Sequence, residues 1–305
     1  MRKLILLNAM LLAMAASPPA AAVLKVFACE PDWAALATEL GGNGVETYSA
    51  TTAQQDVHKI QARPSLIAKY RQADLVICTG SELEIGWLPA LADKGNNPAV
   101  LPGTPGYFEA SQYVQRLEIP VRFDRSQGDV HPDGNPHVQT NPRNITPIAQ
   151  ALSERLAVLD PARAADYRQR HQQFARRWSA AMEKWEARTK PLNGIAVVSH
   201  HKTWVYLYDW LGIREVATLE PKPAIPPSAA HLAQVLESVK RSPVKMIVYS
   251  AYEDSKAADW LAQRVNIPAV QLPLSVGGAK GAEDLFGLYD VTIDRLLQAL
   301  RAGNP

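Results

Sequence analysis

Short apolar runs alternate with amphipathic segments over most of this 305-residue chain. A short apolar run bounded by turn residues predicts a strand, and apolar residues three and four positions apart predict a helix. In the first half, strands are predicted at 23–28, 45–49 and 73–78, and the helices that follow them at 32–40, 64–70 and 84–92. In the second half, strands are predicted at 194–199, 216–219, 246–249 and 270–272, and the helices that follow them at 202–211, 228–240, 255–265 and 284–302. Such alternation predicts an α/β fold with parallel sheets.

A much longer helical pattern separates the two halves. After a helix at 144–159, Asp160 and Pro161 form a helix start, and the pattern continues to about residue 188. Apolar residues recur there at spacings of three, four and seven and form one stripe, Tyr167, Phe174, Trp178, Met182 and Trp185. At about 1.5 Å per residue, such a helix is about 40 Å long. We therefore predict two parallel-sheet α/β lobes, at 23–159 and 191–305, joined by one long rigid helix at 160–190.

Residues 1–22 have the pattern of a secretory signal peptide. Arg2 and Lys3 precede an apolar core at 4–15, and the small residues at 20–22 offer a cleavage site. The apolar core is too short for a transmembrane helix, and no cysteine follows it that could carry a lipid. We expect an exported, soluble monomer. The net charge of +2, without any block of like charge, gives no support for a nucleic-acid partner.

Cys29 and Cys78 are the only cysteines in the chain. Each comes at the end of an apolar run, so parallel strands would bring both to the same edge of one sheet. In an oxidising compartment such a pair predicts a disulfide, which would stabilise the fold by about 4 kcal/mol. A pair of soft metal ligands is the alternative interpretation.

Three of the seven histidines lie in settings suited to a metal ligand. His58 lies in a polar loop, His137 lies in a loop stiffened by prolines, and His201 follows a predicted strand. Neutral imidazole is a strong zinc ligand, and three imidazoles leave a fourth tetrahedral position for a carboxylate or water. Taken singly, His58 is more simply a solvated loop histidine and His137 part of a loop that merely turns the chain, whereas His201 fits a ligand and a histidine packed under the next helix equally well. Because they are far apart in sequence, a common site requires both lobes.

Several segments share the pattern of one known family, namely 56–58 with 63–65, 73–76 with Glu84 and Trp87, 135–137 with 141–142, 160–161 before Tyr167, and His201 with Trp204, Tyr206 and Gly212. Over essentially the whole mature chain, the sequence resembles the zinc/manganese substrate-binding proteins of ABC transporters. The resemblance implies two α/β lobes joined by a long helix, a periplasmic location and an inner-membrane ABC permease as partner. It implies His58, His137 and His201 as metal ligands, and it selects His201 rather than His200.

The resemblance leaves the fourth ligand open. The family commonly places an aspartate in the last loop before the C-terminal helix, but residues 272–278 contain no acid here. Asp56, Glu283, Asp284 or a water molecule could complete the shell. His131 is interpreted as a solvated loop histidine, with metal gathering as the alternative. Two further histidines receive structural interpretations, a packed or boundary position for His171 and a surface position for His231.

An imidazole-rich site favours zinc as the captured ion, because manganese prefers more oxygen donors, although manganese or another divalent ion stays possible. The sequence thus predicts a binding protein, not an enzyme, that captures zinc between two lobes. A secreted zinc hydrolase is the alternative, since three histidines and a water also form a catalytic shell. No His-Glu-x-x-His motif supports it. A receptor for a chelated metal would leave the three histidines unexplained.

Overall fold

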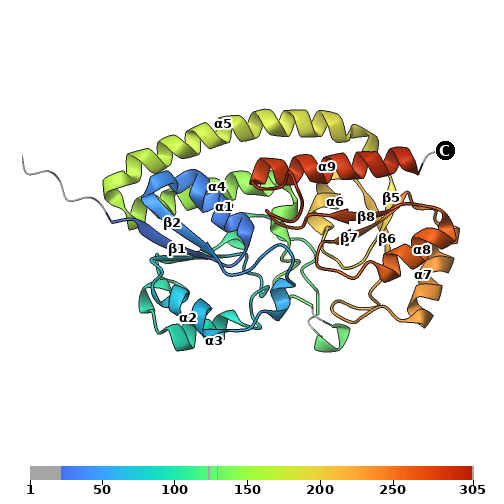
Figure 1. Ribbon diagram of the computed structural model, residues 1–305, viewed down its shortest axis with the longest axis horizontal. Helices are drawn as coiled ribbons and strands as arrows, with labels where there is room; N and C mark the ends of the chain where they lie inside the picture. Colours follow the sequence, from blue (N-terminus) through green and yellow to red (C-terminus); the bar gives the residue numbers. More distant parts are fainter. Residues whose placement is uncertain (1–21, 123, 129, 304–305) are drawn as a thin grey trace, which may run out of the picture.

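The computed structural model describes residues 22–122, 124–128 and 130–303. The predicted signal peptide lies outside the described residues except for Ala22. Two four-stranded parallel sheets lie side by side, one in each half of the chain (Figure 1). The first has the order β2-β1-β3-β4, with β1 at Leu24–Ala28, β2 at Val45–Ser49, β3 at Leu75–Cys78 and β4 at Tyr107–Glu109. The second has the order β6-β5-β7-β8, with β5 at Ala196–Ser199, β6 at Arg214–Thr218, β7 at Met246–Ser250 and β8 at Ala269–Leu272.

Helices cover both faces of each sheet. The first lobe contains α1 (Pro31–Gly41), α2 (Pro64–Arg71), α3 (Leu88–Gly95) and α4 (Pro142–Leu159). The second lobe contains α6 (Val205–Leu211), α7 (Ala229–Arg241), α8 (Lys256–Val265) and α9 (Leu285–Ala302). Two separate apolar clusters lie under α2 and α3 and under α7 and α8. On the opposite faces, one continuous cluster includes side chains of both lobes. The predicted two-lobed α/β fold is confirmed.

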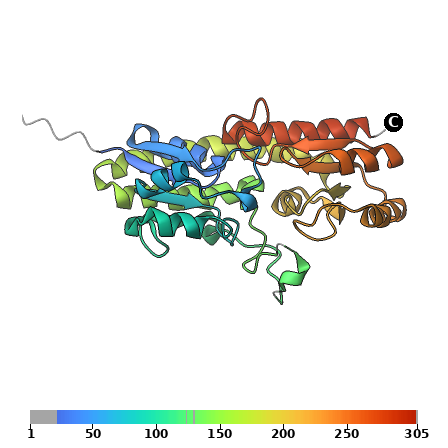
Figure 2. The same cartoon turned by 60° about the horizontal axis from the view of Figure 1, so that its bottom comes forward.

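The long helix α5 (Ala164–Thr189) runs along both lobes (Figures 1 and 2). It begins after a short 3-10 turn at Pro161–Arg163, four residues later than the sequence predicted. The stripe is buried as predicted at Tyr167, Phe174, Trp178 and Trp185, whereas Met182 is half-buried. The Trp178 indole donates to the carbonyl of Pro142 at 2.9 Å, which ties α5 to the start of α4. Trp178 also packs against Phe286 and Tyr289 of α9, which ties α5 to the second lobe. No helix within the described ranges has the length and apolar character needed to cross a membrane.

The beginnings of two helices differ from the sequence-based prediction. Helix α3 begins at Leu88 rather than at 84, because residues 81–87 form turns and Trp87, with a φ angle of −145°, lies outside the helical region. In α1, Pro31 is the first helical residue. The carboxylate of Asp32, the next residue, is buried and accepts from Ser275 Oγ at 2.5 Å in the second lobe.

The predicted disulfide between Cys29 and Cys78 is present. Cys29 follows β1 and Cys78 ends β3, and these strands are neighbours in the first sheet. The two Cα atoms are 4.8 Å apart, and both side chains are fully buried. The bond closes the carboxyl edge of the first sheet, close to the loops that face the second lobe.

Candidate metal centre

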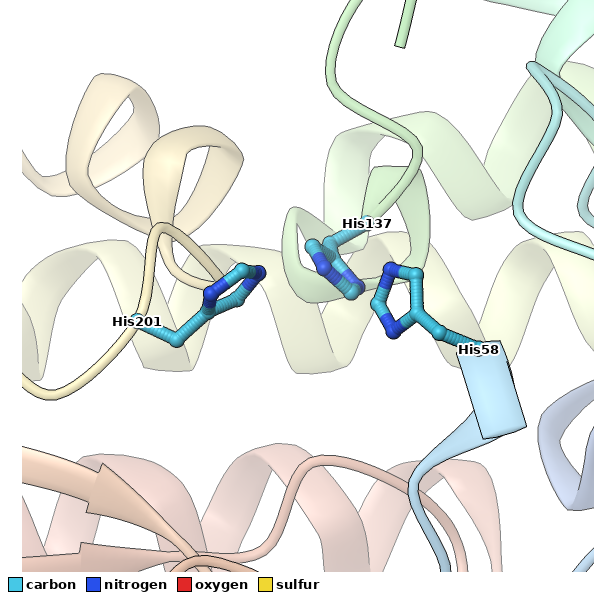
Figure 3. A group of neighbouring side chains, drawn as sticks. All are labelled: His58, His137 and His201. Carbon is cyan, nitrogen blue, oxygen red and sulfur yellow. The ribbon is translucent and has the colours of Figure 1, made fainter. Parts of the chain in front are cut away.

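The three predicted histidines meet between the lobes. His58 lies in a 3-10 turn at Val57–Lys59 after β2, His137 precedes the 3-10 turn at Val138–Thr140, and His201 follows β5. Their ring centres form a nearly equilateral triangle with separations of 5.8, 5.9 and 5.9 Å. One ring nitrogen from each lies within 4.8 Å of the others. Figure 3 shows the rings directed toward one another from three separate segments, and we call them the three-histidine cluster.

The spacing of the cluster suits a small divalent ion. A point equidistant from three ring centres at these separations lies about 3.4 Å from each. An imidazole nitrogen about 2.1 Å from zinc places its ring centre about 3.2 Å from the ion. That point lies in the plane of the ring centres, whereas a tetrahedral shell holds the ion out of the plane, with the ring centres about 5.2 Å apart. Coordination of zinc therefore requires the rings to approach one another by about 0.6 Å, and it leaves one position for another donor.

Two carboxylates orient two of the rings. Asp56 Oδ1 lies 2.9 Å from His58 Nδ1, and Glu220 Oε2 lies 2.7 Å from His201 Nδ1. A carboxylate at Nδ1 favours the tautomer that carries its hydrogen there and leaves Nε2 free for a metal. Burial would raise the pKa of Asp56, but its hydrogen bond to His58 and that residue's charge outweigh burial and lower the pKa well below its ordinary value. Asp56 is therefore ionised at neutral pH.

His137 is the most enclosed member of the cluster, with an exposed fraction of 3%. Neither of its ring nitrogens has a hydrogen-bond partner among the described residues, and the same holds for His58 Nε2. Burial lowers the pKa of His137 well below its ordinary value, and the neighbouring His58 and His201 lower it further. A buried polar atom without a partner is costly. One ring nitrogen of His137 and Nε2 of His58 are thus suited to accepting a metal ion.

Both lobes fix the loop that carries His137. Asn135 Oδ1 accepts from the His137 amide at 3.1 Å, and the carbonyl of Asn135 accepts from Tyr206 Oη at 2.9 Å. Tyr206 belongs to α6 in the second lobe. The aromatic residues that follow His201 therefore position the histidine loop of the first lobe.

The acids considered as fourth ligands have other roles in this structure. Asp56 orients His58, Glu283 Oε1 accepts from the amide of Gly281 at 3.0 Å, and Asp284 caps α9 through the amide of Gly287 at 2.8 Å. In the region the structure describes, the group of potential ligands at this point consists of the three histidines alone. The last loop before α9 is bound to the first lobe through Asp32 and Ser275.

Among the described residues, the other four histidines contribute no nitrogen to the group that lies within 4.8 Å. His200 is 7% exposed, and burial lowers its pKa. His171 is half-buried on α5, as its place on the stripe predicted. His231 was expected at the surface, but it is half-buried and its Nε2 lies 2.9 Å from the carbonyl of Thr218. His131 was interpreted as a solvated loop residue, but it is half-buried and its ring centre lies 5.4 Å from that of His58.

A buried carboxyl pair lies beside the disulfide. Glu84 accepts from the amide of Thr79 at 2.8 Å, and Glu30 accepts from the Thr79 hydroxyl at 3.1 Å. Both side chains are almost completely buried. Burial raises the pKa of Glu30 well above its ordinary value, and the nearby Glu84 raises it further. Although Glu84 lies near both cysteine sulfurs, these sulfurs are joined in the disulfide and do not form a thiolate metal site.

Comparison with known proteins identifies the family. A family model described as the periplasmic component A of a zinc-uptake complex (ZnuA) matches residues 26–302. The chain belongs to the ZnuA family. Its members are the substrate-binding proteins of zinc or manganese ABC transporters, which bind metal and are not enzymes, so the alternative of a secreted hydrolase is not favoured.

Relatives of this ZnuA-family chain are distant in sequence. The zinc-binding lipoprotein AdcA of Streptococcus pneumoniae serotype 4 is 22% identical over 289 residues, which cover 88% of this chain and 54% of AdcA. The chain therefore spans about half the length of that relative. The manganese ABC transporter substrate-binding lipoprotein PsaA of Streptococcus anginosus is 21% identical, with 91% of this chain and 89% of PsaA covered.

Solved structures share the fold. A crystal structure of ZnuA superposes with a TM-score of 0.76 at 18% identity, covering 92% of this chain and all of that chain. The cadmium-bound periplasmic metal-binding protein of Candidatus Liberibacter asiaticus has a TM-score of 0.74 at 16% identity, covering 91% of this chain and 99% of that chain. At this identity the likeness establishes the two-lobed fold, and the ligands of this chain must be argued from its own side chains.

Proposed function

We propose that this protein captures zinc with His58, His137 and His201 and delivers it to an inner-membrane ABC permease. The observation that carries the proposal is the convergence of three imidazoles between the lobes, two of which, His58 and His137, have buried ring nitrogens without a hydrogen-bond partner. The family membership supports the transport role. The predicted signal peptide at 1–22 supports a soluble periplasmic protein that encounters free zinc outside the cytoplasm.

Zinc is favoured over manganese by the chemistry of the donors. Three neutral imidazoles form a nitrogen-rich site, whereas manganese prefers carboxylate, carbonyl and water oxygens. The two acids beside the cluster, Asp56 and Glu220, contact the outer nitrogens of the histidines and are thereby engaged as orienting groups. Neither is placed as a free general base, which also weighs against hydrolysis.

The test is a zinc titration of the metal-stripped mature protein against a competing chelator of known affinity. We expect one zinc per protein, bound more tightly than manganese in a direct competition. His58→Ala, His137→Ala and His201→Ala should each lower zinc affinity at least about tenfold, because each removes a ligand. His171→Ala on α5 is the matched control and should bind as the unmodified protein does. Unchanged affinity in all three ligand variants, or tighter binding of manganese, would contradict the proposal.

A further inference from the structure

His131 is in ring contact with the three-histidine cluster although it lies on a different part of the loop from His137. Its ring centre is 5.4 Å from that of His58, closer than any two members of the cluster are to each other. It also lines an open cavity of about 320 Å³ together with His137 and His201. His131 therefore faces the same space as the open coordination position.

The connection that carries His131 is attached to the second lobe before this residue. It runs through 114–136, of which 123 and 129 lie outside the described residues. Lys222 Nζ donates to the carbonyl of Ser126 at 2.7 Å. At Gly128 a Cβ would lie only 2.4 Å from the carbonyl oxygen of Pro223, so only glycine permits this close approach. The connection thus lies directly against the second-lobe segment that follows Glu220.

It is also attached after His131. Asn135 Nδ2 donates to the carbonyl of Lys202 at 2.8 Å, next to His201 in the chain. The ammonium group of Lys202 in turn pairs with Glu118 at 2.5 Å. Contacts to the second lobe occur on both sides of His131 in the sequence. These contacts hold the backbone of His131 beside the three-histidine cluster.

We propose that His131 is the fourth zinc ligand, in the position where related proteins commonly use an acid. The inference rests on the proposed function and adds one residue to it. The ring contact with His58 and the cavity shared with His137 and His201 support this position. The nitrogens of His131 are outside the group that lies within 4.8 Å, so its side chain must turn inward when the ion binds.

A fourth imidazole makes the shell entirely nitrogenous, which strengthens the preference for zinc over manganese. This fourth ligand would come from the first-lobe connection at 114–136, which contacts the second lobe at Lys202 and Lys222. Zinc release would then begin with withdrawal of His131, which opens one coordination position while the other three ligands stay in place.

X-ray absorption of the zinc-loaded mature protein tests the assignment without any substitution. We expect four imidazole nitrogens around zinc in the unmodified protein, and three with one oxygen in His131→Ala. His131→Ala should bind zinc about 10- to 100-fold more weakly, and His131→Asp should raise manganese affinity relative to zinc. His171→Ala is the control for loss of a histidine elsewhere.

The two proposals fail in different ways. Three imidazoles in the unmodified protein, with zinc affinity unchanged in His131→Ala, would overturn the role of His131 and leave the three-histidine receptor intact. Failure of the unmodified protein to bind zinc one-to-one would overturn both. Thermal unfolding of the metal-free variants shows whether His131→Ala is folded, and the absorption result for the unmodified protein decides the matter independently of that variant.

Discussion

Two substitutions of Glu220 test whether its hydrogen bond to His201 orients that ring for zinc binding. Its carboxylate lies 2.7 Å from His201 Nδ1, and the two side chains are only 15% and 10% exposed. A hydrogen bond to a charged group contributes about 1.5–3 kcal/mol, and a neutral acceptor gives roughly half of that. Glu220→Gln keeps an acceptor but loses the charge, so we expect zinc affinity to fall about tenfold. Glu220→Ala removes the acceptor as well, and we expect a loss of about 100-fold, or about 2.7 kcal/mol.

Chelator competition measures both affinities, with Glu237→Gln as the control. Glu237 is exposed on α7 and pairs with Lys240, and exposed pairs of this kind contribute little. The order of the two Glu220 variants is informative, because partial retention by glutamine is expected of an orienting hydrogen bond. The reasoning is refuted if both variants bind zinc as tightly as the unmodified protein does. It is also refuted if the metal-free variants unfold so early that the affinity loss follows from the fold.

Two further predictions concern the fold around the site. Cys29→Ser combined with Cys78→Ser opens a loop with a sequence separation of 49 residues, and denaturant titration should show a loss of about 4 kcal/mol in unfolding free energy. A loss below about 1 kcal/mol would contradict the entropic argument. Burial raises the pKa of Glu84 from 4.5 to about 7, so its stabilising contribution is complete below pH 4.5 and is lost as pH rises through about 7. The thermal midpoint of the metal-free protein should therefore fall more between about pH 5 and 8 in the unmodified protein than in Glu84→Gln, and parallel curves would disprove this.

The regular elements were predictable where burial imposes a clear period. Parallel strands covered on both faces form continuous apolar runs, and the stripe on α5 has the helical period. The strand β4 was not predicted, because only Tyr107–Glu109 pair with β3 and they follow a stretch rich in proline and glycine. The start of α3 was predicted too early, because residues 84–87 form turns that end at Trp87, and apolar periodicity does not distinguish such turns from a helix.

The site was only partly predictable. The three histidines were found from their settings and the family resemblance, and the structure brings them together. Glu220 was missed because it is 19 residues from His201 and follows an ordinary strand. A signal was nevertheless present. β5 and β6 are neighbouring parallel strands, and His201 and Glu220 each come two residues after the end of their strand. Equal offsets from adjacent strand ends place two side chains at the same edge.

The apolar cluster that runs through both lobes has a consequence for how this protein can change over evolution. Trp33 of the first lobe, Trp178 of α5 and Leu272 of the second lobe belong to one continuous core. Neither half can be exchanged for a foreign domain without exposing part of that core to water, so the scaffold is inherited as a unit. The three proposed zinc ligands, by contrast, all lie outside the strands and α-helices. Selection for a different ion can therefore act on single loop residues, at little cost to folding.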